Sequence, residues 1–377
     1  MAKLGDIATY INGYAFKPQD WSDEGIPIIR IQDLTGNSYQ ANRYNGEYAS
    51  KYEVNDGDVL ISWSASLGVY IWHGEKAVLN QHIFKVVFDK ERISKDFFVH
   101  QVGLILENAA SDAHGATMKH LTKPVFDALP FYLPPYKKQC EIAEVLDKVT
   151  SLISLRKQQL AKLDELVKAR FVEMFGDFEV NPKEFPVYHL CELCDVGSSK
   201  RIYQEEQSIS GIPFLKVADL NELIDTGKYL CSTFIPLERY EQLLHKELTP
   251  KENDILITSR GTLGKCYIVQ SDDEFYFQDG MISWLSNLSP KVSSIYISYL
   301  FAQPYIQKQI ESLQAGSTVA YLSIAMLKKM NVILPPKKLQ DDFATFVEHV
   351  DQQKQTVQQS LEKLELMKKA LMQEYFG

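Results

Sequence analysis

The chain of 377 residues contains no long run of apolar residues. A helix that crosses a bilayer needs about 20 consecutive, mostly apolar residues, and no stretch here approaches that length. The first segment, Met1–Tyr10, lacks the apolar core of a signal peptide. These absences predict a soluble protein that is located in the cytoplasm.

Cysteine is scarce. The five cysteines are an odd number, and their spacing is not that of a disulfide framework. Cys191 and Cys194 have the spacing of half a zinc site, but Cys231 and Cys266 stand alone and the eight histidines form no short-range pair. We therefore expect free thiols in a reducing compartment and no bound metal.

An excess of positive charge is also missing. The formal net charge is −9, with 13 basic and 16 acidic residues in 1–137 and 15 basic and 20 acidic residues in 177–337. The overall field therefore repels nucleic acid. Any contact with DNA must come from local patches, or with help from basic partner subunits.

Motifs for catalysis are incomplete. The run Leu133–Tyr136 is similar to an amino-methyltransferase motif, but leucine stands where Asn or Asp must accept a hydrogen bond from the target amino group. Gly261–Lys265 is too short for a phosphate-binding loop, and Cys266 replaces the required hydroxyl residue. No glycine-rich cofactor loop precedes these runs. We predict no catalytic residues and no cofactor.

What the chain does contain is a repeat. Residues 113–176 align with residues 314–377 at a constant offset of 201 without a gap, and 19 of the 64 pairs are identical. The pairs include Gly115/Gly316, Thr117/Thr318, Leu133–Pro135/Leu334–Pro336 and Gln139/Gln340. Upstream, 25–30 is similar to 211–216, and 58–62 to 254–258. The period is too long for a solenoid, so the chain consists of two copies, each a head followed by a tail.

Each tail has the heptad spacing of a coiled-coil helix. The stripes are Ile142, Leu146, Val149, Ile153, Arg156, Leu160, Leu163, Val167, Arg170 and Met174, and Phe343, Val347, Val350, Lys354, Val357, Leu361, Leu364, Lys368, Leu371 and Tyr375. Pro135 and Pro336 lie just before the helices, where proline is tolerated. We expect the two helices to pair as an antiparallel coiled coil with the heads at opposite ends, related by a pseudo-twofold axis. The alternative is that each helix packs only on its own head.

The heads are predicted to be mixed α/β (α+β) domains. Expected strands are Asp58–Trp63, Val69–Trp72, Ile83–Phe88, Asp254–Thr258, Cys266–Val269 and Met281–Leu285, which are rich in β-branched and aromatic residues. One helix is expected to follow in each head, over Ser94–Ser111 and Ser293–Gln314. A polar Gly-Thr loop, a short helix and a strand that ends at Leu-Pro-Pro complete each copy.

The loop that links two strands in each head is the best candidate for ligand binding. Ser62–Gly68 corresponds to Thr258–Gly264, and both loops gather hydroxyl groups, a large side chain and glycine. Hydroxyl and backbone N–H groups suit phosphate oxygens, Arg260 suits a guanine edge, and the Asn and Gln side chains suit adenine. A solvated turn is the alternative reading of these loops. The candidate DNA-contact residues are Arg30, Ser62, Trp63, Ser64, Ser66, Asn80, Gln81, His82, Thr117, Lys119, Lys216, Ser259, Arg260, Thr262, Lys265, Gln278, Thr318 and Tyr321.

With its repeat, paired Leu-Pro-Pro runs, following glutamines and coiled-coil tails, the whole chain resembles the specificity subunit of type I restriction–modification systems. The resemblance implies target-recognition domains at 1–136 and 177–336, and helices at 137–176 and 337–377. It also implies a non-catalytic subunit of a DNA adenine methyltransferase/restriction endonuclease complex. Such a subunit recognises a bipartite asymmetric site in double-stranded DNA and recruits two methyltransferase subunits, with restriction/translocase subunits in the full complex.

Two alternatives remain open at this point. A fused methyltransferase–recognition enzyme would need the cofactor loop that is missing. A coiled-coil scaffold whose heads bind proteins would have the same tails. The heads differ most in their loops while the tails match, which favours a ligand of variable sequence such as DNA.

Overall fold

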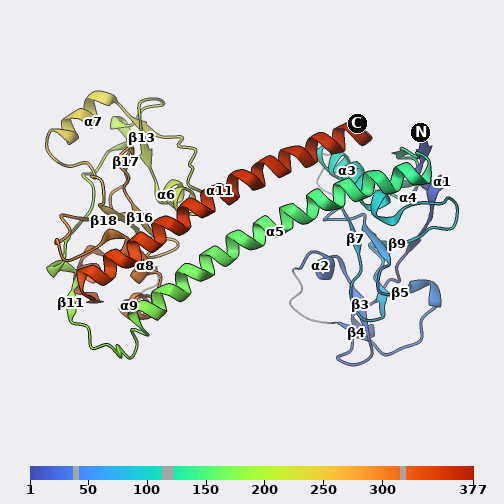
Figure 1. Ribbon diagram of the computed structural model, residues 1–377, viewed down its shortest axis with the longest axis horizontal. Coiled ribbons are helices and arrows are strands. Elements are labelled where there is room, and N and C mark those ends of the chain that lie inside the picture. The colour runs from blue at the N-terminus through green and yellow to red at the C-terminus, as the bar shows by residue number, and fades with distance from the viewer. Residues whose placement is uncertain (37–41, 113–121, 315–319) are drawn as a thin grey trace. The chain divides into compact units, whose positions relative to one another are not determined.

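The computed structural model describes residues 1–36, 42–112, 122–314 and 320–377 (Figure 1). The chain divides into two compact units: unit 1 is Met1–Gln159 with Val357–Gly377, and unit 2 is Leu160–Thr356. We call residues 1–135 head 1 and residues 177–336 head 2. Each unit therefore contains one head and about half of each long helix.

The described residues of head 1 form two four-stranded sheets and a strand pair. The first sheet is antiparallel, in the order β2-β9-β6-β7; the second has the order β4-β3-β8-β5, and β1 pairs with β10. The strands are β1 Ala2–Lys3, β2 Thr9–Asn12, β3 Ile26–Ile29, β4 Arg43–Tyr44, β5 Glu53–Val54, β6 Val59–Ser62, β7 Gly68–Ile71, β8 Ala77–Leu79, β9 Ile83–Val87 and β10 Pro130–Phe131. The helices are α1 Leu4–Ile7, α2 Ile31–Leu34, α3 Lys95–Asp112 and α4 Lys123–Asp127.

The central strand β6 is buried on both of its faces. Val59 and Ile61 belong to the core that also holds Phe97 and Phe98 of α3, whereas Leu60 belongs to a second core with Leu79 of the other sheet. Successive side chains of a strand point to opposite faces. An unbroken apolar run is therefore what a strand between two cores requires, and this explains why the segment was recognisable from its sequence.

Head 2 repeats this plan. Its sheets have the orders β12-β18-β15-β16, β14-β13-β17 and β11-β19. The strands are β11 Val187–His189, β12 Asp195–Gly197, β13 Ile212–Leu215, β14 Phe234–Ile235, β15 Ile255–Thr258, β16 Cys266–Ile268, β17 Tyr276–Phe277, β18 Ile282–Ser286 and β19 Asn331–Ile333. The helices are α6 Val217–Thr226, α7 Leu237–Leu244, α8 Ser294–Phe301, α9 Pro304–Leu313 and α10 Ile324–Lys329. All six predicted strands and the internal repeat are confirmed.

One predicted helix is wrong. Ser293–Gln314 was expected to be continuous, but the structure has α8 and α9, which are separated at Ala302 and Gln303. Pro304 is the first residue of α9. Proline has no backbone N–H and clashes with the preceding turn, so it begins a new helix instead of continuing the old one. The expected start of the helix is confirmed, because Ser293 is the N-cap of α8 and its side chain accepts a hydrogen bond from the Tyr296 amide.

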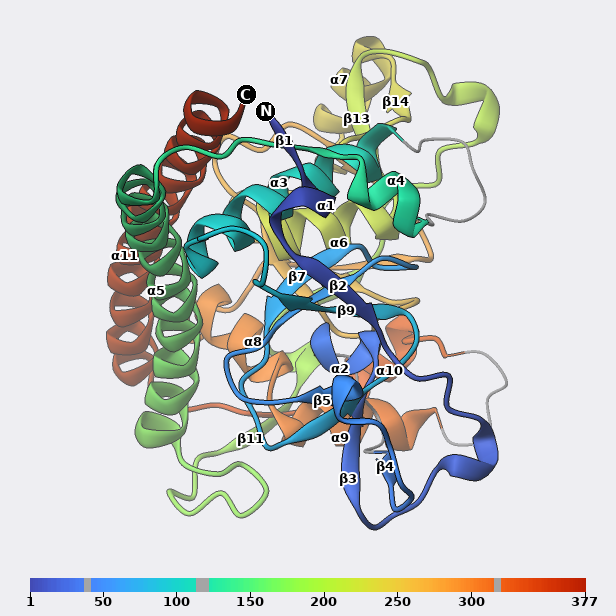
Figure 2. The same cartoon turned by 90° about the vertical axis from the view of Figure 1, so that its right-hand side faces the viewer.

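The tails form the helices α5 Tyr136–Phe175 and α11 Lys337–Phe376, which lie side by side (Figures 1 and 2). In unit 1, Arg156 Nε donates to Ser360 Oγ at 3.3 Å and Lys157 pairs with Glu365 at 3.0 Å. An early segment of α5 thus meets a late segment of α11. The predicted antiparallel pairing is confirmed here.

Unit 2 shows the same pairing with the helix halves exchanged. Lys354 Nζ lies 2.7 Å from Asp164 Oδ1, and the guanidinium of Arg170 lies 5.7 Å from the ring centroid of Phe346. A late segment of α5 here meets an early segment of α11. Every residue of the two predicted stripes is buried or half-buried, so the heptad seam was identified correctly.

The helix ends also complete the cores of the heads. In unit 1, Phe376 packs on Phe97 of α3, and in unit 2 Phe175 packs on Tyr296 of α8. Each head thus receives the start of the helix that follows it and the end of the helix from the other repeat. The two long helices therefore pair with each other and also pack on the heads. Within the described ranges, no helix has the length and apolar character needed to cross a bilayer.

Candidate nucleic-acid interface

The strand register of head 1 brings several candidate residues to one end of a sheet. Asn12 pairs with Phe84, and Ser62 pairs with both Ile83 and Gly68. The end of β2, the end of β6 and the starts of β7 and β9 therefore lie at the same end of the sheet. The loops 63–67 and 80–82 emerge there together.

Two further segments reach this end of the sheet, one after β3 of the neighbouring sheet and one after β2. The Asn80 amide donates to the Ile29 carbonyl at 3.1 Å, which brings Arg30 beside this loop. Tyr14 forms a backbone bridge with Asn80. A side chain at Gly13 would place its Cβ 2.0 Å from the Asn80 carbonyl oxygen, so only glycine allows this approach. We call residues 12–16, 30, 63–67 and 80–82 rim 1.

Head 2 builds the same edge. Gly197 pairs with Trp284, Thr258 with Ile282, and Ile257 with Cys266. The Gln278 amide donates to the Leu215 carbonyl at 2.9 Å, which places Lys216 as Arg30 is placed in rim 1. We call residues 198–203, 216, 260–264, 278–281 and 321 rim 2.

Trp63 of rim 1 is anchored by contacts with three other side chains of head 1. Its indole stacks on Phe84 with ring centroids 5.6 Å apart and 23° between the planes, and His82 lies 5.5 Å away. Its Nε1 donates to Asn12 Oδ1 at 3.2 Å. The half-buried ring is held in one orientation, as a stacking or edge-reading surface requires.

Polar groups surround this ring. A ring nitrogen of His82 lies 3.1 Å from Gln81 Nε2, so the bond between them depends on the histidine tautomer. Asn80 and Ser64 are half-buried, and Ser66 is exposed. Rim 1 therefore presents amide, hydroxyl and imidazole groups around an aromatic ring.

Two predicted contact residues have structural roles. Ser62 is 0% exposed and its hydroxyl donates to the Ser64 carbonyl at 3.2 Å, while Ser259 is 1% exposed and shares a 2.7 Å hydrogen bond with Ser283. Both hydroxyl groups are buried, and each forms a hydrogen bond within its own head. We therefore leave Ser62 and Ser259 out of the surface proposed below.

Arg30 is also engaged within head 1. Its side chain is 15% exposed and its Nε lies 3.3 Å from Asp33 Oδ2. The side-chain oxygens of Gln32 and Asn42 accept from its guanidinium in the amide orientation that satisfies both groups. Arg30 therefore supports rim 1 from within. Its counterpart Lys216 is exposed.

In rim 2 the structure joins two candidates that are far apart in the sequence. Arg260 and Tyr321 form a backbone bridge, and the guanidinium lies 5.1 Å from the tyrosine ring centroid. The adjacent Leu322 amide donates to the Ser259 carbonyl at 3.0 Å. Arg260 itself is exposed. Its guanidinium group, with its hydrogen-bond donors, therefore lies over the Tyr321 ring at rim 2.

The remaining candidates have three different outcomes. Thr262 is exposed and Gln278 is half-buried at rim 2. The Lys265 ammonium group contacts both carboxylate oxygens of Asp225 at 2.6 and 2.7 Å and is therefore already paired. Three candidates lie outside the described residues: Thr117, Lys119 and Thr318.

Sequence reasoning did not select Tyr14 or Arg201. Tyr14 is exposed beside Asn80, and Arg201 Nε lies 2.8 Å from Asp279 Oδ2 in rim 2. No local motif marks these positions, because they reach the rim only through strand pairing. Among the described residues, no group of three or more His, Cys, Asp or Glu side chains is arranged to hold a metal ion.

The chain is similar in sequence to known proteins. A family model described as the type I restriction modification DNA specificity domain matches residues 1–165 and again residues 182–366. The chain is 25% identical over 381 residues to the type I restriction enzyme EcoBI specificity subunit of Escherichia coli, and the alignment covers 92% of this chain and 78% of that protein. It is 24% identical over 397 residues to the MjaVIII specificity subunit of Methanocaldococcus jannaschii, and this alignment covers 99% of this chain and 90% of that protein.

The fold also has a solved counterpart. The crystal structure of the type I restriction–modification system S subunit from M. genitalium superposes with a TM-score of 0.60 at 15% identity. The superposition covers 100% of this chain and 95% of that chain. At this level of identity the likeness concerns the fold alone.

Proposed function

Because the chain belongs to the type I restriction–modification DNA specificity family, we propose that it is a non-catalytic subunit that recognises a bipartite, asymmetric site in double-stranded DNA. The observation that carries the proposal is the pair of rims. Strand pairing builds the same backbone arrangement at the rim of both heads, yet the side chains of rim 1 and rim 2 differ. Two heads with the same backbone and different rim side chains suit two half-sites of different sequence.

The chemistry of the rims indicates what each can read. Rim 1 offers Asn80 and Gln81 in the loop whose His82 lies beside Trp63, and Asn and Gln pair bidentately with adenine in the major groove. Rim 2 offers the exposed Arg260 and Lys216, and Arg pairs bidentately with guanine. The hydroxyls of Ser66 and Thr262 suit backbone phosphates.

We further propose that the helices carry partner subunits. In unit 1, Val145, Leu152 and Leu155 are exposed on α5, and their spacing places them on one face beside the buried seam. A groove of about 730 Å³ between α3, α5 and α11 combines apolar Ile153 with the basic Lys368. Such a surface fits apolar and acidic side chains of another protein.

The partners we propose are two methyltransferase subunits, with restriction/translocase subunits in the full complex. A net charge of −9 is unfavourable for binding DNA alone. Partner subunits would supply much of the positive surface around the duplex, as well as the cofactor and the chemistry. We place this complex in the cytoplasm, where it meets DNA, and keep 1–136 and 177–336 as the recognition domains, with 137–176 and 337–377 as the helices.

The decisive experiment is co-expression of this chain with the methyltransferase subunit of its own operon in a host without adenine methylation. Single-molecule sequencing should then reveal one asymmetric two-part motif, and gel shifts should show specific binding by the complex. The chain alone should transfer no methyl group from S-adenosylmethionine. Methylation by the isolated chain would favour the fused enzyme, and a complex without any sequence preference would favour a protein-binding scaffold.

A further inference from the structure

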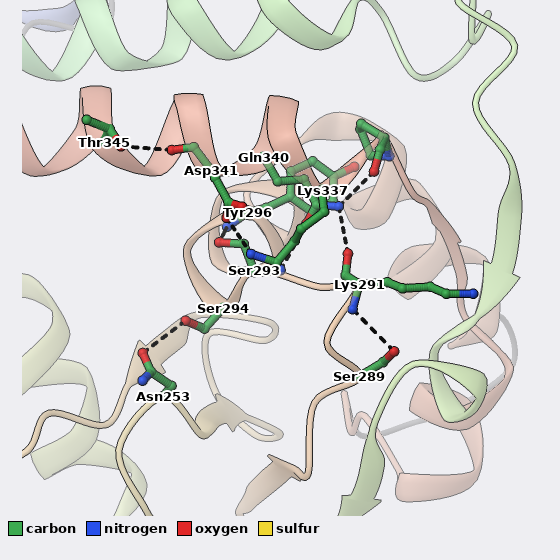
Figure 3. A network of polar contacts seen from close by, with 11 residues as sticks. Asn253, Ser289, Lys291, Ser293, Ser294, Tyr296, Lys337, Gln340, Asp341 and Thr345 are labelled. Atoms are coloured by element: carbon green, nitrogen blue, oxygen red, sulfur yellow. Dashed lines mark hydrogen bonds and ion pairs between the residues drawn. The ribbon is translucent and has the colours of Figure 1, made fainter.

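Gln340 forms a buried polar joint at the start of α11 (Figure 3). Its side chain is 0% exposed. Oε1 accepts a hydrogen bond from the Ser293 amide at 2.9 Å, and Nε2 donates to the carbonyls of Pro335 at 2.7 Å and Lys291 at 3.1 Å. One amide thus connects the segment that precedes α8 with the turn that begins α11.

Gln139 repeats this joint in unit 1. It is 1% exposed, its Oε1 accepts from the Ser94 amide at 2.9 Å, and its Nε2 donates to the Pro134 carbonyl at 2.9 Å. The two glutamines occupy equivalent positions of the repeat, and their partners are equivalent backbone groups. The arrangement therefore recurs in two heads whose other contacts differ.

The chemistry of this joint suits an amide. The side chain must accept from one backbone N–H and donate to at least one carbonyl at the same time, and the oxygen and NH₂ group of a glutamine side chain do both. Glutamate can accept but cannot donate when ionised, and an apolar residue can do neither. A buried amide left unpaired would be unfavourable.

The bonded groups belong to different parts of each unit. Ser94 and Ser293 directly precede α3 and α8. Phe97 and Phe98 of α3 belong to the core of head 1, and the Tyr296 hydroxyl of α8 donates to the Ile333 carbonyl of β19 in head 2. Pro134 and Pro335 belong to the turns that lead into α5 and α11. A rotation of a head about this turn would displace its rim relative to the helix, and the glutamine bonds resist that rotation.

We infer that Gln139 and Gln340 are positioning residues, which fix the orientation of each head on its helix and thereby set the half-site spacing that the complex accepts. This inference rests on the proposed function. Gln340 is the better one to test, because its side chain bonds three backbone groups, those of Ser293, Pro335 and Lys291.

The test is Gln340→Met, which keeps the length of the side chain and removes its polar groups. The matched control is Gln353→Met, at an exposed position of the same helix. Methylation by the complex is measured on two duplexes with intact half-sites, one with the native gap and one with a gap longer by one base pair. We expect the preference for the native gap to fall roughly fivefold in Gln340→Met, the change that corresponds to about 1 kcal/mol, and to stay unchanged in the control.

A purely structural role predicts a different result. Loss of stability alone would lower methylation of both duplexes by the same factor, and an unchanged preference would overturn the inference. If Gln340→Met does not assemble, Gln340→Asn enters the same assay, because it keeps the amide group on a side chain that is one methylene too short to keep all three hydrogen bonds.

A second readout does not involve DNA. Spin labels are attached through unnatural amino acids at the exposed Ser271 of head 2 and Gln355 of α11, both in unit 2. The distance distribution should broaden in Gln340→Met and remain narrow in Gln353→Met; an unchanged distribution would refute the positioning role. If the wild-type complex modifies no two-part site, the proposed function fails, while this measurement still decides the role of Gln340.

Discussion

Phe376, the penultimate residue of the chain, packs its ring on Phe97 of head 1, with centroids 5.4 Å apart and an angle of 64° between the planes. Leu371, Met372 and Tyr375 join it against the same core. The N-terminal head is thus completed by the C-terminal end of the chain. This contact explains why unit 1 contains both chain ends.

Phe376→Ala should destabilise unit 1. Removing a ring from a core costs about 3–5 kcal/mol when the ring is fully buried, and Phe376 is only half-buried, so we expect about 2 kcal/mol. Thermal unfolding followed by circular dichroism measures the effect. Met367→Ala, at an exposed position of the same helix, is the control, and equal melting temperatures for both variants would contradict the role of the Phe97 contact.

A half-chain of residues 1–176 should form a homodimer. Phe175 occupies the position of Phe376 in the repeat and can supply the missing ring to the head of the second copy. With the methyltransferase, this dimer should methylate a palindrome made from the first half-site. Analytical ultracentrifugation and motif mapping test both statements. A stable monomer, or an unchanged asymmetric motif, is incompatible with them.

Replacing Leu160 and Leu361 by Asp together should separate the two long helices. Leu361 is buried in the seam and Leu160 is half-buried there, and an unpaired carboxylate in an apolar seam is strongly unfavourable. We expect loss of complex assembly, measured by size-exclusion chromatography. Leu366→Asp, at an exposed position, should assemble normally, and normal assembly of the double variant would show that the seam is wrongly placed.

Arg260→Ala should relax one position of the second half-site and weaken binding by roughly 1–3 kcal/mol, the value of a lost bidentate base contact. The first half-site should stay unchanged, because Arg260 belongs to rim 2 only. Motif mapping and gel shifts give the two readouts. Lys246→Ala, an exposed lysine outside the rim, serves as control; an unaltered motif in Arg260→Ala would exclude this loop as a reading element.

Asp254 should make head 2 less stable at neutral pH than its asparagine variant. Burial raises the pKa of this carboxyl group, against the opposing hydrogen bonds from the Lys251 amide and the Trp284 indole. The charged form is therefore disfavoured in the folded state. Asp254→Asn should gain stability above the raised pKa, and this gain should shrink as the pH falls through it.

Denaturant melts over a pH series measure this dependence. The equivalent Asp58 of head 1 is a matched comparison, because its carboxylate lies 2.9 Å from Lys85 Nζ. Asp58→Asn breaks that ion pair and should bring no gain at neutral pH. A stability gain for Asp254→Asn that does not change with pH would contradict the assignment to a buried charge.

The sequence by itself determined the two-copy organisation, the long helices and six strands of the heads. These features depend on local patterns: the heptads before and after Leu160, the prolines 135 and 336, and the apolar run Val59–Ile61. It also determined the family, because the repeated motifs keep their spacing. The continuous helix predicted over 293–314 failed because the break at Pro304 was overlooked.

Tertiary structure alone decided which candidates are available to a ligand. Ser62 and Arg30 were reasonable contacts by residue type, but their partners Ser64, Asp33 and Asn42 occupy them in the folded head. Hydrogen bonds and burial depend on neighbours brought close by strand pairing, and residue spacing does not encode them. For the same reason, only the folded chain shows that Gln340 joins a head to its helix and that Phe376 completes the core around Phe97.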